Sequence, residues 1–379
     1  LASAHAELYL ETNRELFRTY AKLIEPVRDY LRKVLPPEPA QPQAAYERSI
    51  RAQGFDLLRS LLPASTLTNM GVFGNGRFFE GLLIRLRLQT LQEFQNLASA
   101  AEQELRQVIP SFIRRADPTH RHFYSQLKFQ QQSQNFFNRW VQPLTLKSST
   151  PQSASVELLS YDPEAEIEVL AALFYENSEL PFAQARENVR GLSDQERESL
   201  LRQWAELREH RRHKLGRALE HASYTFDIVG DYGSYRDLHR HRILTQERQR
   251  LTTRLGYTIP RSLVDAGLES PVRKVLEKAA SAFEVLEEGF PQEAQYVVPM
   301  AYQLRWSLKI NLRSLMWLVE LRTTPQGHDN YRWLAQQMFQ RVQEVQPQLA
   351  QLMCFVNLEN YPLGRLAAEV KQELRKQSS

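Results

Sequence analysis

The chain has 379 residues, enough for one large domain or two ordinary ones, and its 42% hydrophobic and 24% charged residues are typical of a globular protein. No run of about eighteen apolar residues occurs, which excludes a membrane-spanning helix, and no basic-then-apolar secretion signal opens the chain. One cysteine, Cys354, rules out an internal disulfide, and its apolar neighbours predict a buried, unreactive thiol. We therefore expect a cytoplasmic protein without a membrane partner.

The charge of the chain favours anionic partners. Lys and Arg outnumber Asp and Glu by 48 to 44, which gives a formal net charge of +4. The basic residues cluster at 208–214 (REHRRHK) and 236–242 (RDLHRHR). Nucleotides and nucleic acids both suit such clusters, and charge alone does not choose between them.

The N-terminal part of the chain is predicted to be helical. Apolar residues at helical spacing predict helices over 4–34 and from 45 to 62, and the proline-rich stretch 36–43 predicts the loop between them. The glycines of GVFGNGR (71–77) do not predict a phosphate-binding loop, because the strand and the Lys-Ser/Thr pair that such a loop needs are absent.

A Ser/Thr/Pro-rich link, LKSSTPQSAS, ends the helical, glutamine-rich stretch 99–150. We place a domain boundary there, between domains at 1–150 and 151–379. Strands are predicted where β-branched and aromatic residues gather, and helices where a cap precedes an apolar period of 3.6 residues. The elements expected in the second domain are, in order, a strand at 156–161, a helix capped by Asp162, a helix at 192–221 capped by Ser193, a strand at 224–230, a short helix that delivers residues 240–242, and a helix at 271–289.

The stretch NLRSLMWLVELR, 311–322, predicts a helix with one buried face, because its apolar residues recur at helical spacing. Arg313 and Arg322 stand nine positions apart, near the two ends of this helix. A helix rises about 1.5 Å per residue, so the two guanidiniums start roughly 13 Å apart along one rod. That span suits an elongated anionic ligand, while a core helix with solvated arginines is the alternative that spacing alone leaves open.

An internal repeat relates two parts of the chain. Identical residues fall 236 positions apart: Pro63 and Pro299, Asn75 and Asn311, Arg77 and Arg313. Because apolar residues also match in this frame, we predict that residues 46–98 are a second copy of the stretch that contains the helix at 311–322. The copies are complementary. The first has Arg59 where the second has Gln295, and the second has Arg322 where the first has Leu86.

Four motifs together resemble the flavin-dependent (alternative) thymidylate synthases. They stand in that family's order and at its spacing: LEHASYTF at 219–226, RHR at 240–242, AQYVVP at 294–299 and NLRSLMWLVELR at 311–322. The last resembles the family's helix, which carries an Asn-x-Arg pair and ends in Leu-Arg. The resemblance implies an α+β fold of tandem thymidylate synthase-complementing-type domains, rich in helices and with an antiparallel sheet. It also implies a homodimer that mimics the homotetramer of ordinary members.

The resemblance implies roles for particular residues. FAD would be held by residues of the RHR and Asn-x-Arg motifs: Arg240, His241, Arg242, Asn311, Arg313 and, in the first copy, Asn75 and Arg77. Arg322 would face the pyrimidine of deoxyuridylate (dUMP) as the catalytic residue, and Arg59 would contact the same nucleotide. The implied reaction converts dUMP to dTMP with a methylene group from methylenetetrahydrofolate, and NADPH regenerates the reduced flavin.

Four residues depart from the family's pattern. Arg250 stands where the family has a nucleotide-binding Ser, Thr252 where it has Arg, Arg248 where it has an acidic residue, and Asp237 where it has Gln. This copy is therefore expected to keep much of the flavin half of the signature and to have lost most of the dUMP half. Since the first copy has no counterpart of 156–257 and the chain lacks an initiator Met, we expect that half-domain upstream of Leu1.

Two other functions are compatible with the sequence. One is a degenerate family member that binds flavin or nucleotide without turnover. The other is a nucleic-acid-binding module that uses the basic residues of 208–242, although nucleic acid is not the expected partner. A metal site through His239 and His241 lacks a Cys partner or a His-Glu-x-x-His frame, so no metal is expected.

Overall fold

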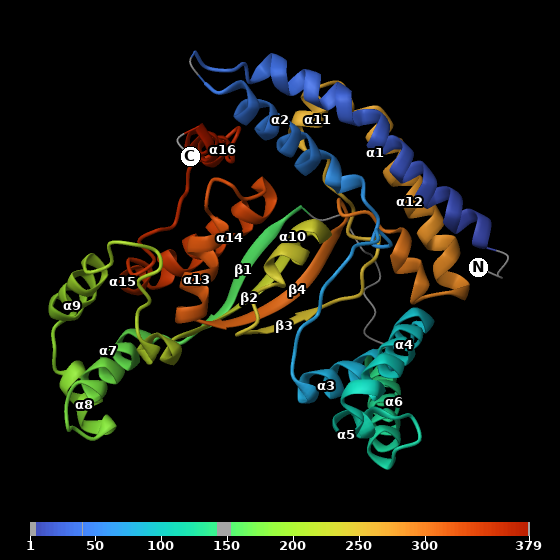
Figure 1. The fold of residues 1–379 in the computed structure, drawn as a ribbon. Helices are drawn as coiled ribbons and strands as arrows, with labels where there is room; N and C mark the ends of the chain where they lie inside the picture. Colours follow the sequence, from blue (N-terminus) through green and yellow to red (C-terminus); the bar gives the residue numbers. More distant parts are fainter. Residues whose placement is uncertain (1–4, 40, 142–152, 378–379) are drawn as a thin grey trace. The chain divides into compact units, whose positions relative to one another are not determined.

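The computed structural model describes residues 5–39, 41–141 and 153–377 (Figure 1). The chain forms two compact units. The first comprises Leu1–Ala64, Thr150–Phe283 and Val297–Ser379, and the second comprises Ser65–Ser149 and Glu284–Tyr296. The boundary expected at 150 lies outside the described residues, so the division into domains at 1–150 and 151–379 stays a prediction.

In the part of the chain that the structure describes, four antiparallel strands form one sheet, in the order β1-β2-β4-β3 (Figure 1). Their bounds are β1 Ser155–Tyr161, β2 Ser223–Asp231, β3 Thr245–Arg248 and β4 Gln303–Asn311. The strands predicted at 156–161 and 224–230 are confirmed as β1 and β2. β4 was missed, although its buried residues alternate with more exposed ones, which is the period of a strand. The expected helix-rich α+β fold with an antiparallel sheet is confirmed.

One face of the sheet is apolar and carries two helices. Tyr224, Phe226 and Ile228 of β2 are buried on this face. Helices α10 (Tyr232–Leu238) and α14 (Asp329–Val345) both pack on the sheet and on each other. Residues between the buried ones are polar, and Arg305 of β4 forms an ion pair with Asp227 of β2. The sheet therefore follows the apolar-in, polar-out alternation of an antiparallel sheet with one covered face.

Helices α7 (Ala165–Glu176), α8 (Phe182–Arg190) and α9 (Asp194–Glu206) follow β1. The capping box at Ser193 is confirmed, with Glu196 as its partner. The single helix expected over 192–221 is wrong beyond Glu206, because the chain turns so that Arg208 enters the interior. Asp162 is not the cap of α7, whose N-cap is Glu164; instead the Asp162 carboxylate accepts from the Glu164 N–H.

The N-terminal helices belong largely to the first unit. They are α1 (Ala6–Val34) and α2 (Gln43–Leu58), and α12 (Glu269–Gly289) begins in the same unit. All three were predicted. An ion pair between Glu15 and Lys278 joins α1 to α12.

After α2 comes a 3-10 turn, η1 (Arg59–Leu61), and then a short antiparallel contact between Pro63 and Pro299. The Ala64 N–H donates to the Val298 carbonyl and the Met300 N–H donates to the Leu62 carbonyl, both at 3.0 Å. Ala64 and Met300 are 236 positions apart in the chain, as are Leu62 and Val298 and the two prolines. The bridge is therefore symmetric in the frame of the sequence repeat.

Each unit contains a helix trio, a set of three helices in the same order. The trio of the second unit is α3 (Gly76–Arg87), α4 (Gln92–Val108) and α5 (Pro110–Ile113), with α6 (Arg121–Val141) after it. The trio of the first unit is α13 (Leu312–Arg322), α14 and α15 (Pro347–Ala350), with α16 (Leu366–Gln377) near the C-terminus. Asn75 caps α3 and Asn311 caps α13, each by accepting from the N–H three residues on at 2.9 Å.

The cores of the two trios correspond as well. Leu83, Ala98, Ile113 and Ala116 are buried together in the second unit. The residues 236 positions later, Val319, Leu334, Leu349 and Leu352, are buried in the first unit. Equivalent positions of the repeat are therefore buried in both trios.

Two smaller findings complete the fold. Cys354 is exposed, so its predicted burial is wrong; it follows α15 directly after the buried Leu352 and Met353. Among the described residues, no helix is both long and apolar enough to cross a membrane.

Candidate functional site

A cleft of about 570 Å³ in the first unit collects most of the residues singled out from the sequence. It is lined by α13, by the segment after α10 and by residues of 211–220. Among the described residues, six cationic side chains line it: Arg211, Lys214, Arg240, Arg242, Arg313 and Arg322. Two carboxylates, Glu220 and Glu320, also line it. The cleft is thus strongly cationic, which suits an anionic ligand.

The RHR segment follows the C-terminal end of α10. The Asp231 carboxylate caps this helix by accepting from the Ser234 N–H at 2.9 Å, and the helix ends at Leu238. The turn continues with the His241 N–H donating to the Leu238 carbonyl at 3.1 Å. The short helix ends before the motif, and the turn then places Arg240, His241 and Arg242 at the cleft.

His241 accepts a hydrogen bond from Arg322. The Arg322 Nε–H donates to His241 Nε2 at 3.0 Å. Burial, and then the charge of Arg322, lowers the pKa of His241 to about 4. His241 is therefore neutral at neutral pH and serves as the acceptor that orients Arg322. The Arg322 guanidinium also lies 5.4 Å from the ring centroid of Tyr331.

Helix α13 supplies Arg313 as well as Arg322. Asn311 uses its side chain as the N-cap, so it positions the helix. Arg313, in the first turn, donates to Glu220 at 2.6 Å. Arg217 and then Arg313 lower the pKa of Glu220, so this carboxylate is held in its charged form.

A buried ion pair lies beneath the cleft. Arg208 forms two parallel hydrogen bonds with Glu320, at 2.6 and 2.8 Å, and the two side chains keep 2% and 1% of their exposure. The charge of Glu320 is therefore already matched inside the protein and does not reduce the cationic character of the cleft. Arg208 belongs to the basic cluster 208–214, so the surface that a nucleic-acid-binding module would use loses this cation.

Trp317 is a residue of the cleft that sequence reasoning missed. Its ring is 38% exposed, and Arg211 and Lys214 lie 5.7 and 5.8 Å from its centroid. The ring offers a flat face beside cations, an arrangement that suits a planar anionic ligand. The signal was available, because Trp317 stands four residues after Arg313 and so shares its helix face.

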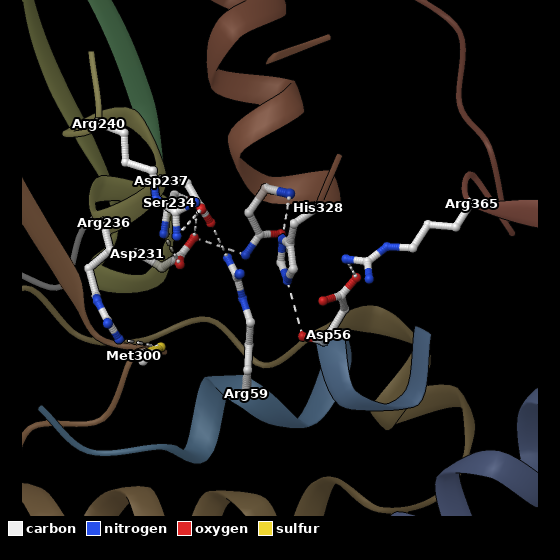
Figure 2. Close-up of polar contacts among 11 residues, drawn as sticks. Asp56, Arg59, Asp231, Ser234, Arg236, Asp237, Arg240, Met300, His328 and Arg365 are labelled. Atoms are coloured by element: carbon white, nitrogen blue, oxygen red, sulfur yellow. Dashed lines mark hydrogen bonds and ion pairs between the residues drawn. The ribbon is translucent and has the colours of Figure 1, made fainter. Parts of the chain in front are cut away.

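Arg59 lies in a polar network next to the cleft. Figure 2 shows Arg59 reaching from η1 toward Asp237, and its Nη2 donates to the Asp237 carboxylate at 3.0 Å. Arg240 approaches the other oxygen of Asp237 at 3.6 Å. His328 of the same network lies 3.1 Å from the Asp56 carbonyl. One carboxylate thus separates Arg59 from Arg240, which lines the cleft.

Not every predicted residue lies here. Asn75 and Arg77 belong to the second unit, where Asn75 caps α3 and Arg77 is 79% exposed with Glu80 at 3.9 Å. Arg248, at the end of β3, donates to the Gln249 carbonyl at 2.9 Å. The first unit therefore brings together Arg240, His241, Arg242, Arg313 and Arg322, with Arg59 one carboxylate away.

Comparisons with known proteins identify the family of the chain. Residues 157–348 match the family described as thymidylate synthase complementing protein (Thy1). A UPF0159 protein from Chlamydia muridarum is 43% identical over 373 residues, which cover 98% of this chain and 70% of that protein. A UPF0159 protein from Thermoplasma acidophilum is 33% identical over 341 residues, which cover 88% and 65%.

Two further proteins are similar over shorter parts of this chain. A flavin-dependent thymidylate synthase from Geobacter sulfurreducens is 34% identical over 139 residues, which are 34% of this chain and 60% of that enzyme. Among solved structures, the UMP/dUMP methylase PolB from Streptomyces cacaoi, bound with 5-Br dUMP, is similar with a TM-score of 0.41 and 20% identity. That match covers 54% of this chain and 95% of that one.

Proposed function

Because the chain belongs to the thymidylate synthase complementing protein family, we propose that it is an FAD-dependent enzyme that methylates dUMP to dTMP. Methylenetetrahydrofolate would donate the carbon, and NADPH would supply the reducing equivalents. The observation that carries this proposal is the cationic cleft, where residues of the RHR motif meet Arg313 and Arg322. The cations and the Trp317 ring of this cleft suit an extended anionic ligand that contains a planar ring.

The residues of the cleft fit FAD. Guanidinium groups match phosphate oxygens, so Arg240, Arg242 and Arg313 would hold the diphosphate of the cofactor. Trp317 offers an aromatic face for a planar ring. Bound FAD would supply hydride transfer, a chemistry that the side chains of the protein do not have.

Arg322 would bind the pyrimidine of dUMP. Its guanidinium is oriented by His241 and by the ring of Tyr331. A fixed cation beside the uracil carbonyl would stabilise the negative charge that develops on the ring during the reaction, a contribution of several kcal/mol at most. Because His241 is neutral, it accepts from Arg322 without competing for the same anion.

We further propose that the chain is a tandem duplication of the Thy1 unit. The symmetric bridge between Pro63 and Pro299 supports this proposal, since both of its hydrogen bonds obey the same shift of 236 positions. The two helix trios support it independently, with matching caps and matching buried positions. In this arrangement Arg59 of the first copy would serve a site that the second copy carries.

A tandem chain needs half as many subunits to build the same assembly, so we propose a homodimer that mimics a homotetramer. Light scattering of the FAD-bound protein at micromolar concentration should give twice the mass of one chain. A stable monomer under those conditions would contradict this arrangement.

A specific observation favours a second candidate, a family member that binds flavin or nucleotide without turnover. Arg59, expected to bind dUMP, is paired with Asp237. Arg250 and Thr252 also replace the nucleotide-binding residues of the family's pattern. On this alternative the cleft keeps its flavin function, while the dUMP position is closed by an internal ion pair.

Two measurements on the purified full chain test these candidates. The absorption spectrum should show oxidised flavin, and a chain without any flavin after supplementation with FAD would contradict the enzyme and a flavin-binding relative alike. Labelled methylenetetrahydrofolate, NADPH and dUMP should then yield labelled dTMP. Flavin without product would leave the degenerate member, and the exposed variant Arg261→Ala is a control that should change neither measurement.

A further inference from the structure

Residues 66–74, TLTNMGVFG, are a segment of the second unit that the cleft and its chemistry do not use. They form neither a helix nor a strand, and Figure 1 shows them as a coil that leads into α3. Met70 and Val72 are 79% and 48% exposed, and Phe73 beside them is 100% exposed. Neighbouring exposed apolar side chains of this kind mark an interaction surface.

Both ends of the 66–74 segment are fixed by contacts that recur in the other copy. The bridge at Pro63 lies before it, and Asn75, the cap of α3, follows it. In the second copy the interval from Pro299 to Asn311 has the same length, and it contains β4. The shift of 236 positions therefore places the segment on residues 302–310 without a gap.

β4 is an inner strand of its sheet, whereas the 66–74 segment has no neighbouring strand. β4 pairs with β2 over all nine of its residues and with β3 on its other side. No backbone-to-backbone hydrogen bond joins residues 67–74 to any other residue that the structure describes. A row of backbone donors and acceptors outside any ladder is a template to which another strand can add.

The side chains of the segment follow the alternation of β4. Trp306 and Leu308 are buried on the face of the sheet that carries α10 and α14, and the residues 236 positions earlier are Met70 and Val72. Asn69, which precedes Met70, falls on the polar face. Met70 and Val72 are therefore the side chains that a partner sheet would bury.

The described strands of this chain do not offer the edge that the segment needs. β2 already lies between β1 and β4, and β3 has only four residues. β1 has an open edge, but the irregularity between Leu158 and Ser160 interrupts it. A second copy of the chain has the same strands in the same pairing, so the partner must be another sheet.

We propose that the 66–74 segment is a docking strand, and that its partner is a half-domain of the 156–257 type whose β2-like strand has one edge open. The two strands would pair antiparallel in the register of β2 with β4, which places the residue equivalent to Asp227 opposite Gly71. Met70 and Val72 would enter the apolar layer of the partner. This inference rests on the tandem duplication proposed above, and it gives the second unit an interaction surface of its own.

The probe is a fluorescein-labelled peptide with the sequence of residues 222–231, ASYTFDIVGD, added to the full chain and followed by fluorescence anisotropy. The peptide should bind and should slow hydrogen exchange at the amides of 67–74, whereas a scrambled peptide of the same composition should do neither. No residue of the cationic cleft takes part, so flavin content and dTMP formation report on the proposed enzyme separately.

Variants test which face of the segment is used. Met70→Lys and Val72→Lys should each weaken peptide binding by about tenfold or more, because a lysine would have to enter an apolar layer. Asn69→Lys, on the opposite face of the same strand, is the matched control and should bind like the parent. All three positions are exposed, so the rest of the chain should fold in each variant.

Disulfide trapping tests the register. In a Cys354→Ser background, Gly71→Cys should cross-link to a peptide with Asp227→Cys and far less to a peptide with Val229→Cys. No peptide binding at millimolar concentration, an equal loss in Asn69→Lys, or trapping without preference for register would overturn the proposal. So would a mass that doubles without peptide and returns to one chain in Met70→Lys, because a second copy would then occupy the segment.

Discussion

In each helix trio a buried arginine donates to the backbone carbonyl at the same position of the repeat. The two arginines come from different segments of the chain. In the second unit Arg87 donates to the Ala116 carbonyl and pairs with Glu102. In the first unit Arg208 donates to the Leu352 carbonyl at 2.6 Å and pairs with Glu320. Ala116 and Leu352 are 236 positions apart, so the acceptor is the same position of the repeat.

The difference shows how a buried arginine that stabilises the fold can also position residues of the cleft. Position 323, the counterpart of Arg87, is Thr323, whose hydroxyl donates to the Val319 carbonyl. The arginine is therefore brought in from another segment, where Arg208 also donates to the His213 carbonyl at 3.0 Å. That contact folds the segment against α13, and Arg211 and Lys214 then line the cleft. Arg87 lies in α3 itself, so its contact with Ala116 brings no other segment to a cleft.

Replacing each of the two buried arginines by alanine should give the largest effect, on the free energy of unfolding. Arg208→Ala leaves Glu320 buried without its partner, so we expect the free energy of unfolding to fall by about 3–5 kcal/mol. Arg87→Ala should cost less, because Glu102 keeps Arg106, which donates to it at 2.8 Å. Urea unfolding, with hydrogen exchange to separate the two units, measures both.

The paired replacement Arg208→Met with Glu320→Leu is the control. It removes both charges, so most of the lost stability should return. Equal losses in Arg208→Ala and Arg87→Ala would show that the two ion pairs are equivalent, contrary to the comparison above.

Arg313 of α13 lines the cleft, whereas Arg77, its counterpart in α3, is exposed. Arg313→Ala should lose a charge-assisted contact worth about 1.5–3 kcal/mol and weaken FAD binding tenfold or more. Arg77→Ala, its counterpart, tests whether the first copy also holds flavin. Equilibrium dialysis with FAD measures both variants, and an unchanged affinity in Arg313→Ala would leave that residue only its ion pair with Glu220.

Arg59 of the first copy and Arg322 of the second should act on one nucleotide. They are linked through neighbouring residues, since Arg59 pairs with Asp237, which approaches Arg240, and Arg322 donates to His241. A double-mutant cycle of Arg59→Ala and Arg322→Ala, read as dUMP affinity, should give a coupling above about 0.5 kcal/mol. Additive losses would mean separate sites, and a parent protein that does not bind dUMP would favour the degenerate member.

A further expected effect concerns pH. The pKa of His241 is lowered to about 4 in the folded protein, below its ordinary value of 6.5, so the folded state disfavours the protonated ring. The stability that this gives is present above pH 6.5 and is lost progressively as the pH falls toward 4. Histidine NMR should place the titration near 4, and His241→Gln should flatten this part of the stability profile. Titration of His241 near 6.5 would contradict the predicted burial effect.

Local patterns predicted the local structure. The period of apolar residues located α1, α12 and α13, the Ser193 capping box was readable directly, and β-branched residues marked β2. Contacts between segments that are distant in the chain could not be predicted from local patterns. The ion pair of Arg59 with Asp237 joins residues 178 positions apart, and nothing in either neighbourhood indicates the other.

The same reason explains the errors. The basic run 208–214 has the composition of a solvated helix, but one of its arginines satisfies a buried carboxylate 112 positions away, and this contact ends the helix early. The motifs predicted the residues of 240–242, Arg313 and Arg322, which meet at the cleft, but they also predicted Asn75 and Arg77, which lie in the other unit. They did not show that Asn311 is used as a helix cap, and Trp317 would have had to be found from its helical spacing to Arg313 instead.

The bridge between Pro63 and Pro299 has a consequence for how the chain folds. It closes a loop of 236 residues, for which the entropic cost of bringing the ends together is roughly 5 kcal/mol plus a constant. Contacts of such sequence separation form late and slow the overall rate. During synthesis the segment around Pro63 leaves the ribosome long before Pro299 exists, so its backbone donors and acceptors must stay hydrated until the rest of the chain arrives. We expect this bridge to be among the last contacts formed.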